Sequence, residues 1–167
     1  LSAFGLDRLL HWLLLIEKDT VNLPSIPDSP FIDLIRRIHA QFLEFLDTGQ
    51  GIDEIHDVIL QIRSIAYESG TPRILLISDL IGAVLHKRLE NSTWTCLTKY
   101  TNISTEEWSD TIRKETFITE FWPAQHLLGK KNIFRGVSGV IQMPTSAGKT
   151  KATEIILRSA FLENRTS

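Results

Sequence analysis

The chain has 167 residues, of which 43% are hydrophobic, so it is about one domain long and has enough apolar material for a core. Its one cysteine, Cys96, excludes an internal disulfide, and no apolar run is long enough for a membrane span. Residues 1–119 carry 11 Lys and Arg against 17 Asp and Glu, a net charge of −6, whereas residues 120–167 carry 7 against 3, or +4. We therefore expect an intracellular, cytoplasmic protein without a membrane partner, whose basic end suits an anionic ligand better than its acidic part does.

Helical periodicity dominates the first half of the chain. Apolar residues recur at spacings of three and four in four segments, which predicts four amphipathic helices. These segments are residues 3–18, 30–48, 52–68 and 72–89. Ser29-Pro30 and Thr71-Pro72 are typical helix starts, a capping hydroxyl followed by proline, and Gly49 and Gly70 are typical stops. The pattern predicts an N-terminal helical bundle.

The pattern changes after the fourth predicted helix. Asn91 to Asn102 is polar and rich in threonine, which predicts a loop with a short strand around Trp94–Leu97. Ser104–Glu107 has the composition of a capping box and predicts the start of another helix. Pro123 then begins a short helix that contains Gln125.

A loop that ends in Gly-Lys-Thr follows near the end of the chain. The apolar run Val137–Met143 predicts a strand, and the apolar spacing over residues 151–162 predicts a helix. A strand, a loop ending in Gly-Lys-Thr and a helix are the context of a phosphate-binding Walker A loop. Such a loop presents the unpaired N–H groups of the helix N-terminus to a phosphate.

The residues of this loop predict specific roles in binding ATP and Mg²⁺. Gly148 lacks the Cβ that would block a phosphate. Lys149 would supply the catalytic cation at the β- and γ-phosphate oxygens, and the Thr150 hydroxyl would join the Mg²⁺ shell. The remaining residues of the predicted nucleotide-binding loop are Pro144, Thr145, Ser146 and Ala147.

Two stretches resemble motifs of superfamily 2 helicases, nearest to the DEAD/DEAH-box and superkiller-type branches. Pro144–Thr150 resembles their motif I. These families often have Ala or Met at the position where other Walker A loops have their first Gly, and Met143 stands at that position here. Phe121-Trp122-Pro123-Ala124-Gln125 resembles their Q-motif, whose Gln recognises the edge of adenine. The resemblance implies that Gln125 recognises adenine, and a carboxamide can pair bidentately with adenine N6 and N7.

The resulting fold class is mainly α, with a helical domain over residues 1–115. Residues 116–167 would then form the first strand, loop and helix of a truncated RecA-like α/β P-loop domain. On this interpretation the chain is the front end of an ATP-dependent helicase or translocase that acts on DNA or RNA. The resemblance places motif II and a second RecA-like lobe in downstream domains, and a chain that begins with Leu1 is expected to be a fragment.

Two other interpretations of the chain stay open. In one, the chain is a helical interaction module that binds a protein partner or the downstream domains, and its P-loop is a truncated, non-catalytic stub. In the other, weaker one, the chain is a P-loop kinase. Kinase loops usually keep the first Gly, however, and they do not account for residues 121–125. For Gln125 alone, the simplest interpretation is a solvated helix residue.

Overall fold

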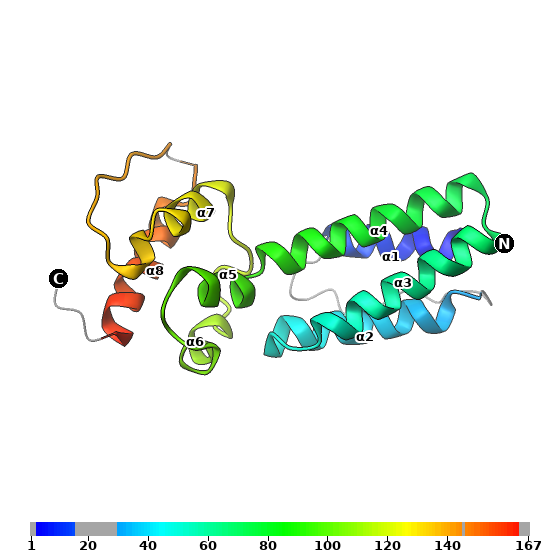
Figure 1. Cartoon of the computed structure of the whole chain (residues 1–167), viewed down its shortest axis with the longest axis horizontal. Coiled ribbons are helices and arrows are strands. Elements are labelled where there is room, and N and C mark those ends of the chain that lie inside the picture. The colour runs from blue at the N-terminus through cyan, green and yellow to red at the C-terminus, as the bar shows by residue number, and fades with distance from the viewer. Residues whose placement is uncertain (1–2, 16–29, 145, 164–167) are drawn as a thin grey trace. The chain divides into compact units, whose positions relative to one another are not determined.

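A computed structural model describes residues 3–15, 30–144 and 146–163 (Figure 1). Within these ranges the chain forms eight α-helices, one short 3₁₀ helix and no strand beyond an isolated bridge. The elements are α1 (Phe4–Leu15), α2 (Ile32–Thr48), α3 (Ile52–Ser69), α4 (Pro72–Asn91), α5 (Thr93–Tyr100), α6 (Thr105–Ile112), α7 (Pro123–Lys130), η1 (Ile133–Arg135) and α8 (Lys149–Leu162). The chain is mainly α, as predicted.

The chain forms two compact units, residues 1–87 and 88–167, and the boundary between them falls within α4. Helices α5 and α6 therefore belong to the same unit as the Gly-Lys-Thr loop. The division of function predicted from the sequence, a helical domain over 1–115 and an ATP-binding segment from 116, stays a prediction.

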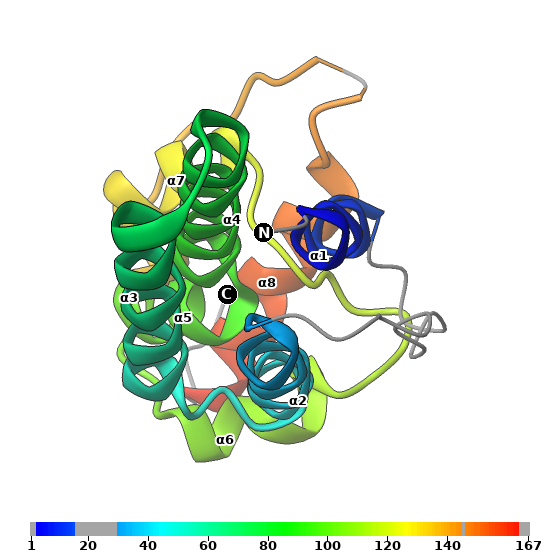
Figure 2. The ribbon, with the colours of Figure 1, turned by 90° about the vertical axis from the view of Figure 1, so that its right-hand side faces the viewer.

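The first unit is the predicted bundle of four helices, which Figure 2 shows end-on around a common core. Helix α2 packs along α3, and α1 packs on α2. The buried side chains follow the apolar stripes of each helix; in α1 and α2 they include Leu6, Leu9, Leu13, Leu34, Ile35, Ile38, Phe42 and Phe45. Gly49 ends α2 in the left-handed conformation, with φ 73°, as its helix-stop role predicts. Ser29 lies outside the described residues.

The loop predicted over residues 91–102 is wrong, because the structure has helix α5 there. Its N-cap is Ser92, whose hydroxyl oxygen accepts a hydrogen bond from the Trp94 amide at 3.3 Å. Two threonine hydroxyls turn back onto the helix backbone: Thr98 donates to the Trp94 carbonyl at 3.2 Å and Thr101 to the Leu97 carbonyl at 2.6 Å. Residues 94–97, predicted as a short strand, lie inside this helix, and Ser92 forms the isolated bridge with Glu120.

The capping box predicted at the start of α6 is confirmed. The Ser104 hydroxyl accepts from the Glu107 amide at 3.3 Å, and the Ser104 amide donates to Glu107 Oε2 at 3.1 Å. The next residue, Trp108, is fully buried; its indole N–H donates to Thr101 Oγ1 at 3.2 Å and its ring stacks on Phe117. The capping box thus places the fully buried tryptophan of the second unit in its core.

The strand predicted over Val137–Met143 is not formed in the structure, where this segment is an irregular connection between η1 and α8 (Figure 1). A strand needs a neighbour for its backbone hydrogen bonds, and no other strand lies in the described ranges. The side chain of Val140 is fully exposed, at 101%, and that of Ile141 is exposed to 38%. Within the described ranges, this apolar segment therefore has no strand to pair with. A RecA-like arrangement of this part of the chain stays a prediction.

Candidate functional site

The Gly-Lys-Thr loop turns directly into the N-terminus of α8. The Pro144 carbonyl accepts a hydrogen bond from the Ala147 amide at 3.2 Å, which forms the turn. Gly148 is the N-cap of α8 and has φ 79°, in the left-handed region that favours glycine. Its carbonyl accepts from the Ala152 amide at 3.0 Å, so the helix starts at once. The glycine of the motif is thus explained by the backbone of the turn.

The predicted phosphate-binding residues lie where the helix amides are unpaired. Lys149 and Thr150 are the first two residues of α8, and both are exposed. The first N–H groups of an α-helix have no partner within the helix and carry a partial positive charge. Ala147 and Gly148 are half-buried, Pro144 and Ser146 are exposed, and Thr145 lies outside the described residues. This end of α8 can therefore receive an anionic oxygen, with an ammonium and a hydroxyl beside it.

The structure brings Gln125 against this loop. A Cβ added to Gly148 would lie 2.9 Å from Gln125 Nε2, which is too close for any residue larger than glycine unless the carboxamide moves. The Gln125 side chain is only 2% exposed, so the interpretation of Gln125 as a solvated helix residue is wrong. Two residues singled out from separate stretches of sequence thus meet in one place.

The carboxamide of Gln125 is held in a defined orientation. Its Oε1 accepts a hydrogen bond from the Trp122 amide at 2.7 Å, which satisfies one of the unpaired N–H groups at the start of α7. An amide oxygen has two acceptor positions, so this bond leaves one for another donor. Because Oε1 is fixed on the Trp122 side, Nε2 points to Gly148.

Helix α7, which carries Gln125, is fixed by a hydrogen-bonded chain. Tyr100 Oη lies 3.0 Å from His126 Nδ1, and His126 Nε2 lies 3.0 Å from Asn91 Oδ1. The Asn91 oxygen can only accept, so Nε2 carries the proton and Nδ1 accepts from the Tyr100 hydroxyl. Burial raises the pKa of Tyr100, aided by the charges of Cys96 and Glu90, so the phenol stays protonated as that donor.

Trp122 is a part of this site that the sequence reasoning did not single out. Its ring atom Cε3 would lie 3.7 Å from a Cβ on Gly148, and its side chain is 54% exposed. The indole therefore offers a flat apolar face beside the loop. The sequence signal that could have identified Trp122 was its position three residues before Gln125, within the stretch that resembles a Q-motif.

Helix α8 is anchored at several points behind the loop. Ile155 is fully buried, and the Ser159 hydroxyl donates to the Phe134 carbonyl of η1. Burial alone would raise the pKa of Glu154, but hydrogen bonds and charges from Arg158 and Lys151 outweigh burial and hold it below its ordinary value. Glu154 is therefore a structural carboxylate of the helix at neutral pH.

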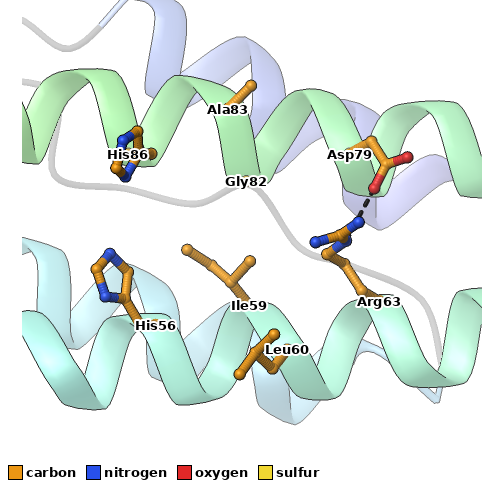
Figure 3. Close-up of a pocket in the computed structure, with 8 residues that line it drawn as sticks. All are labelled: His56, Ile59, Leu60, Arg63, Asp79, Gly82, Ala83 and His86. Atoms are coloured by element: carbon orange, nitrogen blue, oxygen red, sulfur yellow. Dashed lines mark ion pairs between the residues drawn. The ribbon is translucent and has the colours of Figure 1, made fainter.

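The second candidate site is a groove in the first unit, between α3 and α4 (Figure 3). It has a volume of about 510 Å³ and is lined by His56, Ile59, Leu60, Arg63, Asp79, Gly82, Ala83 and His86. The His56 and His86 rings face each other with centroids 6.2 Å apart, and Arg63 Nε pairs with Asp79 Oδ1 at 2.9 Å. The apolar residues between these two polar pairs suit the packing of a partner's side chain better than they suit catalysis.

Neither site contains a group of metal ligands. In the parts of the chain that the structure describes, no three or more His, Cys, Asp or Glu side chains gather where they could hold an ion. Thr150 is thus the one predicted Mg²⁺ ligand, and it is exposed at the start of α8.

The described helices include none with the length and apolar character needed to cross a bilayer.

Comparisons of the chain with models of protein families, with curated proteins and with solved structures found no match.

Proposed function

We propose that this chain binds ATP with Mg²⁺ and is the front end of an ATP-dependent motor of the superfamily 2 helicase type. The observation that carries the proposal is the contact between Gln125 and Gly148, where Nε2 lies 2.9 Å from the position of a Cβ. One of these residues belongs to the stretch that resembles a Q-motif and the other to the stretch that resembles motif I. Their meeting is what a single nucleotide site requires.

Recognition of the base would fall to Gln125 and Trp122. The buried carboxamide has an N–H donor on the loop side and a remaining acceptor position on Oε1, which are the two groups that pair with the adenine edge. The exposed indole of Trp122 would cover the apolar face of the base.

Binding of the phosphates would fall to the start of α8. The unpaired amides after Gly148 and the cation of Lys149 would bind the phosphate oxygens. The Thr150 hydroxyl would contribute to holding Mg²⁺, which when bound neutralises charge on the transferring phosphoryl group.

Exposed apolar side chains of the second unit support the idea that further structure covers this unit in a complete motor. Val137, Val140 and Ile141 precede the loop, and Leu157 and Phe161 lie on the far turns of α8; all five are exposed. Another element that packed on this unit could bury them. We propose that the downstream domains of a RecA-like motor cover it, and that DNA or RNA is the substrate of that motor.

The test of this function is the effect of Gln125→Ala on nucleotide selectivity. Loss of a bidentate contact should weaken ATP binding by about 1–3 kcal/mol and leave GTP binding nearly unchanged. The measurement is titration of the protein with each nucleotide in the presence of Mg²⁺. Gln142→Ala, which truncates an exposed glutamine of the same unit, is the matched control and should change neither affinity. Equal ATP and GTP affinities in the unaltered protein would refute the adenine role.

The second candidate function, a helical interaction module, is favoured by the groove between α3 and α4. Leu60 lines the groove and is exposed, and the same two helices carry three further exposed apolar side chains, Tyr67 on α3 and Leu76 and Leu80 on α4. Such exposed apolar side chains are typical of a surface that receives a partner helix or a downstream domain.

Thiol labelling tests this second function, because the native Cys96 is buried. Leu60→Cys should react rapidly with a thiol reagent in the chain of 167 residues, and at least about tenfold more slowly within the longer protein, where the partner covers the groove. Gln61→Cys, which is exposed but does not line the groove, should react at the same rate in both. Unchanged reactivity of Leu60→Cys would rule out a domain seated on this groove.

A further inference from the structure

A second feature of the unit that carries the loop is a one-sided distribution of charge. Residues 121–153 contain five Lys and Arg and no Asp or Glu. Three of these cations lie at the end of α7 and in η1, and a further cation from outside this range lies at the end of α5; all four side chains are exposed. They are Lys99, Lys130, Lys131 and Arg135, which we call the basic patch.

Specific contacts hold the basic patch together. Arg135 Nη2 donates to the Lys99 carbonyl at 3.0 Å, which ties η1 to the end of α5. Gly129, the residue before Lys130, packs on the ring of Tyr100, since an added Cβ would lie 2.4 Å from Tyr100 Cγ. The Lys99 ammonium lies 5.5 Å from the centroid of the same ring. The three elements that carry the four cations, α5, α7 and η1, are therefore joined by close contacts.

Helix electrostatics alone do not account for the basic patch. A lysine in the last turn of a helix interacts favourably with the negative end of the helix dipole. This interaction is enough to explain the positions of Lys99 and Lys130. Arg135 follows α7, and the absence of acids from residues 121–153 has no such origin.

We propose that the basic patch binds the phosphodiester backbone of a single-stranded nucleic acid. Exposed lysine and arginine side chains contact phosphate oxygens without reading bases, and several cations on one surface can contact successive phosphates of a chain. The choice of nucleic acid over other polyanions rests on the proposed motor function. The surface itself is separate from the residues that we assign to ATP.

The test is binding of the full chain of 167 residues to a fluorescent oligothymidylate, without nucleotide, over a series of salt concentrations. The variant Lys99→Gln, Lys130→Gln, Lys131→Gln keeps Arg135, whose bond to the Lys99 carbonyl is structural. Each cation removed should lower the slope of log K against log salt by about 0.7, so the slope should fall by about 2. Affinity at low salt should fall at least about tenfold.

The matched control is Lys87→Gln, Arg113→Gln, Lys114→Gln, which removes the same charge from exposed positions elsewhere. It should keep the slope of the unaltered chain, and loss of binding in both variants alike would overturn the proposal. Absence of binding by the unaltered chain at low salt, or binding to phosphatidylserine vesicles without binding to the oligonucleotide, would overturn it as well. Failure of Gln125→Ala to alter ATP selectivity would leave these results unaffected, so the two proposals can fail separately.

Discussion

Replacing Lys149 with alanine is expected to abolish ATP hydrolysis by the motor protein of which we propose this chain to be a part. Lys149 is the first residue of α8, exposed beside the unpaired amides that follow Gly148. Its cation would stabilise the negative charge that develops on the phosphate oxygens in the transition state. Loss of one such contact costs on the order of 100-fold or more in kcat.

The control for this prediction is Lys114→Ala, which removes an exposed lysine from the end of α6 in the same unit. Steady-state ATPase assays with saturating nucleic acid should show normal turnover for Lys114→Ala and none for Lys149→Ala. Circular dichroism melting curves should coincide for the two variants, because neither side chain is buried. Normal turnover in Lys149→Ala would contradict the proposal that Pro144–Thr150 acts as motif I.

Replacing Gly148 with alanine is expected to lower ATP affinity at least about tenfold, which corresponds to about 1.4 kcal/mol. Two effects combine. The residue has φ 79°, and the left-handed conformation costs an L-residue with a Cβ about 1–2 kcal/mol. The new Cβ would lie 2.9 Å from Gln125 Nε2, so the carboxamide must move and lose its fixed orientation at the site.

Gly51→Ala separates these two effects. Gly51 is also a helix N-cap in the left-handed conformation, with φ 88°, but an added Cβ would only reach ordinary contact, 3.8 Å from Glu54 Oε2. Thermal unfolding should show a loss of stability in both variants, whereas calorimetric titration with ATP should show weaker binding in Gly148→Ala alone. If both variants bind ATP like the unaltered chain, the contact between Gln125 and Gly148 has no part in nucleotide binding.

Much of the helical fold could be predicted because its signals are local. Helices α2 and α3 have long apolar stripes and clear glycine stops, so these local patterns are sufficient to predict both helices. Helix α5 was missed because it has only 8 residues and its threonines suggest a loop, although the Thr98 hydroxyl bonds back onto the helix backbone.

The strand over Val137–Met143 could not be decided from its own residues. Its apolar composition fits a strand, but the formation of a strand depends on a partner that lies elsewhere, and the described ranges contain none. The boundary within α4 was also invisible in the sequence, because one continuous helix takes part in both units.

The candidate site was predicted in part. The residues of the loop could be named from the pattern Gly148-Lys149-Thr150, and Gln125 from its resemblance to a motif. Their contact could not be predicted, because it depends on how α7 is held by the bonds of His126 to Tyr100 and Asn91. Those are long-range contacts, and no local spacing encodes them.

The most direct test of the proposed nucleotide site is a titration of the isotope-labelled chain with ATP and Mg²⁺, followed by NMR. Binding at the predicted place should shift the amides of residues 146–151, the Trp122 indole and the side-chain amide of Gln125, and GTP should shift the Gln125 group less. A response confined to the groove between α3 and α4, or no response at millimolar ATP, would contradict the account.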